Sequence, residues 1–279
     1  MHKHNIFNGV WMMDQGYASN YLPQIVAFLK GQHHTETPRK EYQALKIYPH
    51  SSSSLSSGPG ESSDNTGNIA VLSISGAITK HDQFCGPAGM VTISNILEEC
   101  YANEDITGIV LKVESGGGEG MAMRLLNETI SKRNKPIVAF IDDFACSAAY
   151  GIVSGCDFIV ANSPMAEIGS IGTYISIADF SKQLEKEGIN LITVYATESE
   201  NKNEEVREAL KGNMKPMQAV ADKFNEYFLQ TIATNRAEQL NEGRKVWGTG
   251  KVFFAEEALE IGLIDEINSF NNILNYFVT

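Results

Sequence analysis

Residues Asp142–Gly172 read DDFACSAAYGIVSGCDFIVANSPMAEIGSIG, and the rest of the chain is organised around them. The apolar run Ile137–Ile141 directly precedes this stretch and is typical of a buried strand. Small residues from Cys146 to Gly151 then predict a helix that begins where the strand ends. A serine in the first turn of such a helix, Ser147, can present its hydroxyl beside free backbone N–H groups. That geometry suits a nucleophile, although on local pattern alone a helix N-cap is the commoner explanation for Ser147.

The composition is that of a globular chain with an acidic balance. Of the 279 residues, 43% are apolar, and the formal net charge is −12. This charge argues against a nucleic-acid partner, because a nucleic-acid binder shows a basic patch. No apolar run approaches the roughly 20 residues needed to cross a bilayer, and the first residues lack the apolar core of a secretory signal. We therefore expect a cytoplasmic protein without a stable membrane anchor.

The cysteines do not indicate a metal site. Their spacing contains no C-x-x-C pair, so neither a zinc site nor a disulfide framework is indicated, and no metal or cofactor is expected. The cysteines are Cys85, Cys100, Cys146 and Cys156.

Three stretches of the chain differ in composition. Residues 1–49 are expected to form an N-terminal arm, residues 50–67 a linker rich in serine and glycine, and residues 68–279 the main domain. Repeated βα units in the main domain predict an α/β fold with a largely parallel sheet. Strands are expected at 69–74, 106–113, 136–141, 157–161, 191–195 and 263–264. Helices are expected at 91–101, from the glycine run to about 133, at 179–187, at 203–236 with a break at Pro216, and at 255–261.

A glycine run, Gly116–Gly118, lies where one of these strands ends and a helix begins. Glycines leave backbone N–H groups uncovered, so the run can bind a developing oxyanion or a phosphate. No G-K-[S/T] follows, and the pattern is not G-x-G-x-x-G. Nucleotide binding is therefore the less favoured interpretation of this run. A tight βα turn without a chemical role is the alternative for this run.

The histidines are confined to the first part of the chain. All of them lie at or before position 81, namely His2, His4, His33, His34, His50 and His81. A Ser-His-Asp triad normally places its histidine in the folded core, and the chain after Ile93 contains none. If Ser147 is a nucleophile, we therefore expect a lysine as its base. The alternative is a histidine of the N-terminal arm, which would have to fold back onto the main domain.

Several motifs occur together and in a fixed order. They are Ser115–Gly118, Ala145–Tyr150, Gly169–Gly172, Gly250–Asp265 and, in the predicted arm, Trp11–Leu29. With them the chain resembles the signal peptide peptidase A (protease IV) family of serine peptidases, and especially its short phage and prophage members. The family's S-P-G-G is present with glycine in the proline position, and its G-S-I-G is intact. The resemblance covers roughly residues 68–268.

The resemblance implies a Clp/crotonase-like fold of stacked β-β-α units. It also implies hydrolysis of peptide bonds by a Ser-Lys dyad. Carried over onto this sequence, it makes Ser147 the nucleophile and Gly117, Gly118 and Ala148 the donors of an oxyanion hole. Ser170, from G-S-I-G, would orient the lysine.

The position of the base is less directly given. In the family, the lysine lies in a loop after the strand that follows G-S-I-G, and here that loop is Tyr195–Asn203. The loop departs from the family pattern because it is acidic and has no glycine. Lys202 is its only lysine, so the resemblance implies that Lys202 is the general base.

The resemblance also suggests substrates and partners. It implies a polypeptide substrate and a ring-like homo-oligomer. The family's classical targets are signal-peptide remnants, whereas phage-type members are implicated in processing capsid or scaffold proteins during prohead assembly. We expect the second in a bacterial host cytosol, because the chain has no apparent membrane anchor and its leader is phage-like.

Three alternatives remain open at this point. Cys146 could be the nucleophile instead of Ser147, although a buried structural cysteine is the simpler interpretation. The protein could be a crotonase-type acyl-CoA enzyme in which Ser147 only caps a helix. It could also be a non-catalytic scaffold with the same fold.

Overall fold

A computed structural model describes residues 9–13, 44–49, 67–83, 86–177, 179–190 and 192–277. Most of the predicted arm, all of the predicted linker except Gly67, and Cys85 lie outside the described residues. The strands are β1 (Gly9–Met13), β2 (Leu45–Pro49), β3 (Asn68–Ser75), β4 (Ile106–Ser115), β5 (Gly117–Glu119), β6 (Ile137–Cys146), β7 (Phe158–Ala161), β8 (Glu167–Gly169), β9 (Tyr174–Ser176), β10 (Val252–Phe254) and β11 (Glu266–Ile267). The helices are α3 (Met90–Ala102), α4 (Gly120–Ser131), α5 (Ala148–Val153), α6 (Ser181–Lys186), α7 (Glu204–Leu210), α8 (Lys215–Asn235), α9 (Arg244–Trp247), α10 (Ala255–Glu260), α11 (Phe270–Ile273) and the 3₁₀ turn η1 (Leu274–Phe277).

The main sheet has the strand order β10-β8-β6-β4-β3-β2, with β7 paired to β6 and β11 paired to β7. Strands β3, β4, β6, β7, β8 and β11 make parallel pairs, and only β2 and β10 join this sheet as antiparallel strands. Strand β6 pairs with β7 along its first half and with β8 along its second half. This topology confirms the expected α/β fold with a largely parallel sheet.

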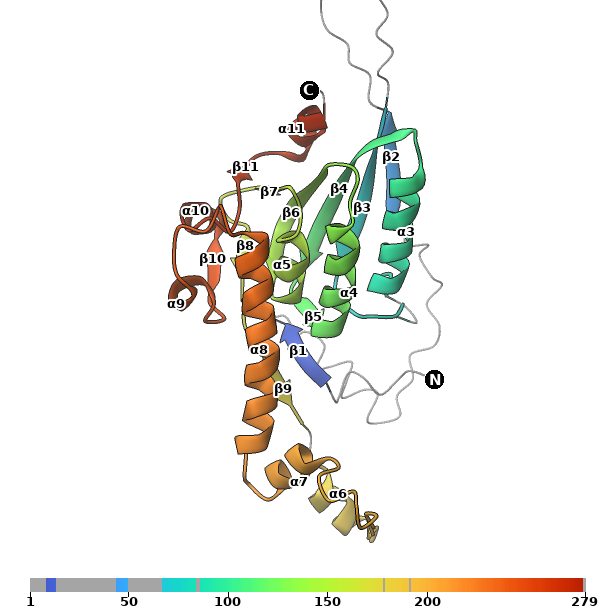
Figure 1. The fold of residues 1–279 in the computed structure, drawn as a ribbon, viewed down its shortest axis with the longest axis vertical. Coiled ribbons are helices and arrows are strands. Elements are labelled where there is room, and N and C mark those ends of the chain that lie inside the picture. Colours follow the sequence, from blue (N-terminus) through green and yellow to red (C-terminus); the bar gives the residue numbers. More distant parts are fainter. Residues whose placement is uncertain are drawn as a thin grey trace, which may run out of the picture.

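Helices cover one face of the sheet (Figure 1), and a second apolar cluster lies on the other face. Helices α3, α4 and α5 lie over one face, where Leu72 and Leu111 belong to the larger core cluster. Alternate residues such as Val71 and Val110 belong to a second cluster, which includes Ile273 of α11. Parallel strands buried on both faces read as continuous apolar runs, which is why these strands were recognisable in the sequence.

Helix α8 connects the body of the protein to a protruding segment formed by residues 179–190 and 192–214 (Figure 1). This segment is called the arm below and is distinct from the N-terminal arm predicted for residues 1–49. Its C-terminal half is anchored by the buried side chains of Phe228 and Ile232. Pro216 lies in its first turn and separates α8 from α7, which confirms the predicted break. Within the described ranges, no helix has both the length and the apolar character that a membrane crossing needs.

Two predicted strands are wrong. Residues 192–195 form no strand, because Ile192 and Val194 are 83% and 88% exposed on the arm and have no strand partner there. Leu263 and Ile264 are buried as expected, but they lie in a connection, and the strand β11 begins only at Glu266. Strand β6, in contrast, is longer than expected and continues to Cys146.

The described parts of the predicted arm pair with the main domain. Strand β2 lies antiparallel to β3 at the edge of the main sheet. Strand β1 forms a separate small sheet in the order β5-β1-β9, antiparallel to both neighbours. These two strands of the N-terminal arm pair with strands of the main domain. The division of the chain into arm, linker and domain stays a prediction.

Candidate active site

Ser147 joins β6 to α5 in a backbone conformation that residues other than glycine rarely adopt. Its φ and ψ angles are 55° and −122°. The Ser147 amide donates to the Gly169 carbonyl at 2.6 Å, and the Ser147 carbonyl accepts the Gly151 amide at 2.9 Å. A non-glycine residue in such a conformation costs on the order of 1–3 kcal/mol and persists only where its surroundings impose it. Sharp strand-to-helix turns of this kind present a nucleophilic serine at the top of a sheet.

The Ser147 hydroxyl is not a helix cap. Helix α5 has no side-chain cap hydrogen bond, so the N-cap interpretation is wrong. Ser147 is only 1% exposed, and its Oγ has no hydrogen-bond partner among the described residues. A buried hydroxyl without a partner destabilises a fold by about 1–3 kcal/mol. Neither capping nor a hydrogen bond within the described chain therefore accounts for this hydroxyl.

Ser170 lies beside Ser147, directly after the neighbouring strand β8. Strands β6 and β8 are parallel, and Cys146 lies opposite Gly169. Ser147 and Ser170 directly follow the two members of this pair. Neighbouring strands lie about 4.8 Å apart. Ser170 also has a positive φ, 49°, and its amide donates to the Lys251 carbonyl at 2.8 Å. The structure thus brings together two of the serines that the sequence singled out.

The glycine run lies at the end of β4, beside the same region of β6. Ser115 pairs with Ala145 across the two strands. The Ser115 hydroxyl donates to the Gly76 carbonyl at 2.6 Å and accepts the Gly117 amide at 3.1 Å. One of the expected oxyanion donors, the Gly117 N–H, is therefore bound to Ser115 in this structure.

Gly118 is fixed by its contact with Ile78. A Cβ at Gly118 would lie 2.0 Å from the Ile78 carbonyl oxygen, so only glycine fits there. The Ile78 amide donates to the Gly117 carbonyl at 2.9 Å, and the Glu119 amide donates to the Ile78 carbonyl at 2.8 Å. Because backbone groups alternate in direction along a strand, the N–H and C=O of Gly118 itself face the opposite edge of β5. Ala148, the third expected donor, is the first residue of α5 and its amide has no acceptor within the helix.

Cys146 has the environment of a structural residue. Its side chain is buried, and its Sγ is 3.8 Å from the Glu167 carbonyl as a weak donor. In the described part of the chain, no group of His, Cys, Asp and Glu side chains is arranged to hold a metal ion.

Lys202 is placed on the arm, away from Ser147. It is exposed in the turn before α7, where its amide donates to the Ser199 carbonyl at 3.1 Å. Helix α7 packs near the start of α8, whereas α8 meets α5 near Phe228, whose ring approaches Gly151. The stretch of α8 from Lys215 to Phe228 is about 20 Å long at 1.5 Å per residue. Figure 1 shows α6 and α7 at the end of α8 that is far from α5.

A second lysine contacts the site through its backbone. The Lys251 carbonyl accepts the Ser170 amide, but its Nζ lies 3.3 Å from a Glu257 carboxylate oxygen and 4.5 Å from the centre of the Phe253 ring. The ammonium group is therefore held over β10 and α10. Sequence reasoning did not single out Lys251, because the motif Gly250–Asp265 that contains it carried no expectation of a catalytic lysine.

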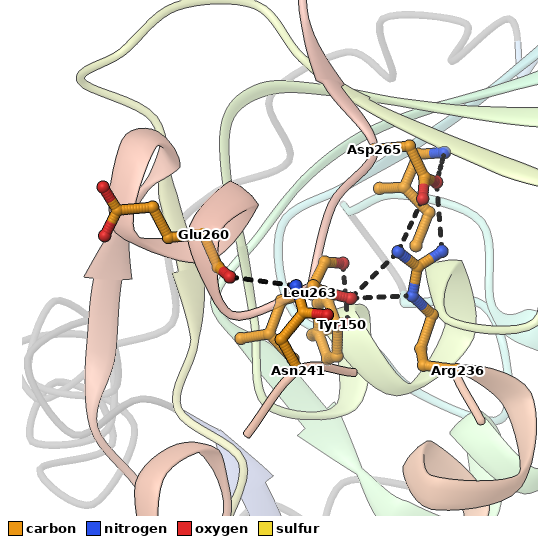
Figure 2. A network of polar contacts seen from close by, with 8 residues as sticks. Tyr150, Arg236, Asn241, Glu260, Leu263 and Asp265 are labelled. Carbon is orange, nitrogen blue, oxygen red and sulfur yellow. Dashed lines mark hydrogen bonds and ion pairs between the residues drawn. The ribbon is translucent and has the colours of Figure 1, made fainter. Parts of the chain in front are cut away.

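A buried polar network holds α5 in place (Figure 2). The Tyr150 hydroxyl donates to the Leu263 carbonyl at 2.8 Å, and burial raises the pKa of Tyr150 well above its ordinary value, which keeps the hydroxyl a neutral donor. The Arg236 guanidinium donates to both carboxylate oxygens of Asp265, at 2.7 and 3.0 Å, and to the Gly262 carbonyl at 3.0 and 3.2 Å. These bonds tie α5 and the end of α8 to one backbone turn.

The same network reaches the sheet. Asp265 accepts the Ile159 amide of β7 at 2.7 Å and returns its own amide to the Ile159 carbonyl. Gly262 has a φ of +83°, and a Cβ there would lie 1.8 Å from the Gln239 carbonyl oxygen. Sequence reasoning missed Arg236, which is 1% exposed, because its partner Asp265 lies far away in the chain.

Comparison with known proteins gives the following similarities. The model of the family described as Peptidase family S49 matches residues 129–277. Protease 4 of Haemophilus influenzae is 29% identical over 214 residues, which cover 74% of this chain and 34% of that protein. The head-tail preconnector protein GP5 of Enterobacteria phage P21 is 26% identical over 219 residues, which cover 76% of this chain and 43% of that protein. Among solved structures, a ClpP1 mutant from Listeria monocytogenes aligns over 73% of this chain and 94% of that chain, with 14% identity and a TM-score of 0.45. The chain therefore spans less than half the length of either curated relative.

Proposed function

The chain belongs to peptidase family S49, and on this basis we propose that it is a serine endopeptidase whose nucleophile is Ser147. The observation that carries the proposal is the Ser147 hydroxyl, which is buried, unpaired and held on a strained turn. The family match spans Ser147, Ser170 and Lys202. The glycine run and Ser170, both beside Ser147, support the same assignment.

In the proposed reaction, Ser147 Oγ attacks the carbonyl carbon of the scissile peptide bond and its proton passes to a neutral lysine. The oxyanion that forms accepts hydrogen bonds from backbone amides, and the Gly118 and Ala148 amides are the best placed for this. The Gly117 amide becomes a third donor once it no longer donates to the Ser115 hydroxyl. Each such donor contributes about 3–4 kcal/mol of transition-state stabilisation. The lysine then returns the proton to the leaving amine, and a water molecule activated by the same lysine hydrolyses the acyl ester.

Lys202 is the base in this proposal, with Ser170 orienting its amine. Because Lys202 lies on the arm, it reaches a Ser147 hydroxyl either when the arm moves or when the arm of a neighbouring copy docks. A lysine acts as a base only when it is neutral, so the docked side chain has to enter a partly apolar environment. Lys202→Ala should remove activity, and Lys202→Arg should not restore it, since arginine stays protonated.

Mixing two inactive variants separates these routes. If the arm of one copy serves another copy, Ser147→Ala and Lys202→Ala recover activity together, since the mixture contains sites with both intact residues. If the arm serves its own chain, the mixture stays inactive. Lys202→Ala that retains most of the activity, while Ser147→Ala does not, would show that another group is the base.

A ring-like homo-oligomer is part of the proposal. The arm and helix α8 expose large apolar side chains, among them Ile189, Ile192, Val194, Leu210, Met214 and Tyr227. Phe224 and Phe228, in contrast, pack on the chain's own core. Exposed apolar side chains gathered on one protruding element mark interaction surfaces. Light scattering at micromolar concentration should give a multiple of the chain mass of 30.6 kDa, and a mass of one chain would contradict it.

For the natural substrate, we propose a capsid or scaffold protein of a phage or prophage in the bacterial cytosol. The relative named head-tail preconnector protein GP5 supports this choice over signal-peptide remnants. Genes for a portal or major capsid protein beside the gene of this chain would support it further. Mass spectrometry of such a capsid or scaffold protein after incubation should show defined cuts, and a preference for isolated signal peptides would contradict it.

An acyl-CoA enzyme or a non-catalytic scaffold is less well supported. Both leave Ser147 a structural residue, yet its hydroxyl caps nothing and has no described partner. Wild-type protein should cleave a denatured protein substrate, and Ser147→Ala should be slower by several orders of magnitude. A Ser147→Ala activity within about tenfold of wild type would contradict Ser147 as the nucleophile.

A further inference from the structure

Strand β1 lies between two elements of the candidate site. It is antiparallel to β5, with Met12 opposite Gly118 and Met13 opposite Gly117. It is also antiparallel to β9, with Val10 opposite Ile175. In the described chain, β5 and β9 are joined only through β1, because the order of this sheet is β5-β1-β9.

One wall of the space that β1 fills is the oxyanion loop. The Ile78 backbone bonds to the Gly117 carbonyl and the Glu119 amide on one edge of β5. The backbone N–H and C=O of Gly118 therefore face the other edge, which is the edge that pairs with β1. The amide expected to bind a developing oxyanion thus faces the backbone of Met12.

The other wall follows directly from the second serine. Strand β9 begins shortly after Ser170 and Gly172 in the chain. The two walls thus belong to the glycine loop on one side of Ser147 and to the G-S-I-G segment on the other. An extended polypeptide laid between them has both of its edges paired, as in the recognition of peptides by strand addition.

We propose that β1 occupies the slot that binds the backbone of the peptide substrate, so that the chain's own N-terminal strand competes with substrates. The proposal rests on the proposed function and adds a regulatory element to it. A protein substrate binds only in the fraction of molecules from which β1 has left. If the slot is free in about one molecule in ten, the apparent KM is raised about tenfold.

A proline at the centre of the strand tests this competition. Trp11 pairs with both Glu119 and Tyr174, so Trp11→Pro removes an amide from a strand that is paired on both edges. Trp11→Tyr is the matched control, since it keeps the amide and a strand-forming residue. In the full chain, Trp11→Pro should lower the KM for an extended peptide about tenfold with kcat unchanged, whereas Trp11→Tyr should resemble wild type. Equal KM values for wild type and a folded Trp11→Pro variant would overturn the proposal.

A reversible lock gives a second test that does not weaken the fold. Paired residues of antiparallel strands have Cα atoms about 4.5–5.5 Å apart, within the range that a disulfide spans. Val10→Cys combined with Ile175→Cys should therefore cross-link β1 to β9 within one chain on oxidation. The oxidised protein should lose peptide cleavage and regain it on reduction, and Val10→Cys alone should not respond.

The outcomes distinguish the occupation of the slot by β1 from the peptidase activity itself. If the reduced double variant cleaves the peptide and the oxidised form cleaves it equally fast, the slot assignment fails and the proposed peptidase function stands. Cross-linking only between two chains would overturn the self-competition. If neither form cleaves the peptide and wild type does not either, the proposed function fails and this inference fails with it.

Discussion

Ser147 and Ser170 stand side by side at the carboxyl ends of two parallel strands, each directly after the matched pair Cys146 and Gly169. Both have positive φ angles, 55° and 49°. The only other described non-glycine residue with a positive φ is Asn203, which directly follows Lys202. Asparagine commonly adopts this left-handed conformation, so the strained serines of the described chain are the two proposed for the reaction, Ser147 and Ser170. Strain of this kind gathers at active sites and is compensated by the rest of the fold.

Ser147→Gly should make the protein more stable and inactive. Glycine adopts the φ of 55° without strain and removes the buried unpaired hydroxyl, so the free energy of unfolding should rise by about 1 kcal/mol or more. Ser154→Gly is the control, because Ser154 has a helical φ of −57° and its buried hydroxyl donates to Gly151 and accepts from Asn235. That variant should lose stability. Urea denaturation measures both, and a destabilised Ser147→Gly variant would refute the strain argument.

Ser170→Ala should slow turnover more than it weakens binding. If Ser170 orients the base, its loss misplaces the amine, which typically costs about 10²-fold in rate. The expected result is a kcat lower by about that factor with little change in KM. Ser163→Ala is the control, because its hydroxyl accepts only the Met165 amide in an exposed turn. Unchanged kcat for Ser170→Ala would remove Ser170 from the reaction.

Asp265→Asn should destabilise the whole domain. It leaves the Arg236 guanidinium, which is 1% exposed, without its carboxylate, and breaking a buried pair in this way costs about 3–5 kcal/mol. Arg244 and Glu226 provide an exposed pair for comparison, with Nη1 and Oε1 2.9 Å apart, and Glu226→Gln should cost less than about 1 kcal/mol. Thermal unfolding of both variants tests this difference. Equal losses would mean that the network of Figure 2 does not hold α5 in place.

Glu114→Gln should stabilise the protein at neutral pH but not in acid. Desolvation by neighbouring atoms, followed by the nearby carboxylates of Asp143 and Asp142, raises the pKa of Glu114, although the residue is exposed on β4. A carboxyl whose pKa is raised on folding binds its proton more tightly in the folded state, so its ionisation opposes folding as pH rises through that pKa. The melting temperature of Glu114→Gln should therefore exceed that of wild type at about pH 7 and match it at about pH 3. A gain that persisted at the acidic pH would show another cause.

Much of the fold could be predicted because the parallel strands are buried on both faces. Apolar runs such as 106–113 and 137–141 read plainly as strands, and Pro216 marked the start of α8. The wrong strand at 191–195 had a similar apolar pattern. Whether Ile192 and Val194 find a neighbouring strand depends on tertiary placement, and they lie exposed on the arm.

The candidate site was predictable only in part. Motifs located Ser147, the glycine run and Ser170, and the fold brings these to one edge of the sheet. Local pattern could not reject the N-cap interpretation, because the positive φ of Ser147 follows from its bond to Gly169 on another strand. The pairing of Arg236 with Asp265 and the position of β1 between β5 and β9 likewise depend on contacts between distant parts of the chain.

The most direct test of the central claim is labelling with a fluorophosphonate, which reacts with activated serines. The label should be found by peptide mass spectrometry on Ser147 of wild type and of Cys146→Ala, and it should be absent from Ser147→Ala. Cys146→Ala should keep its label because the Cys146 side chain is buried and only weakly bonded to the Glu167 carbonyl. Absence of any label on a folded wild-type protein that also fails to cleave peptides, or a label that persists in Ser147→Ala, would contradict Ser147 as the nucleophile.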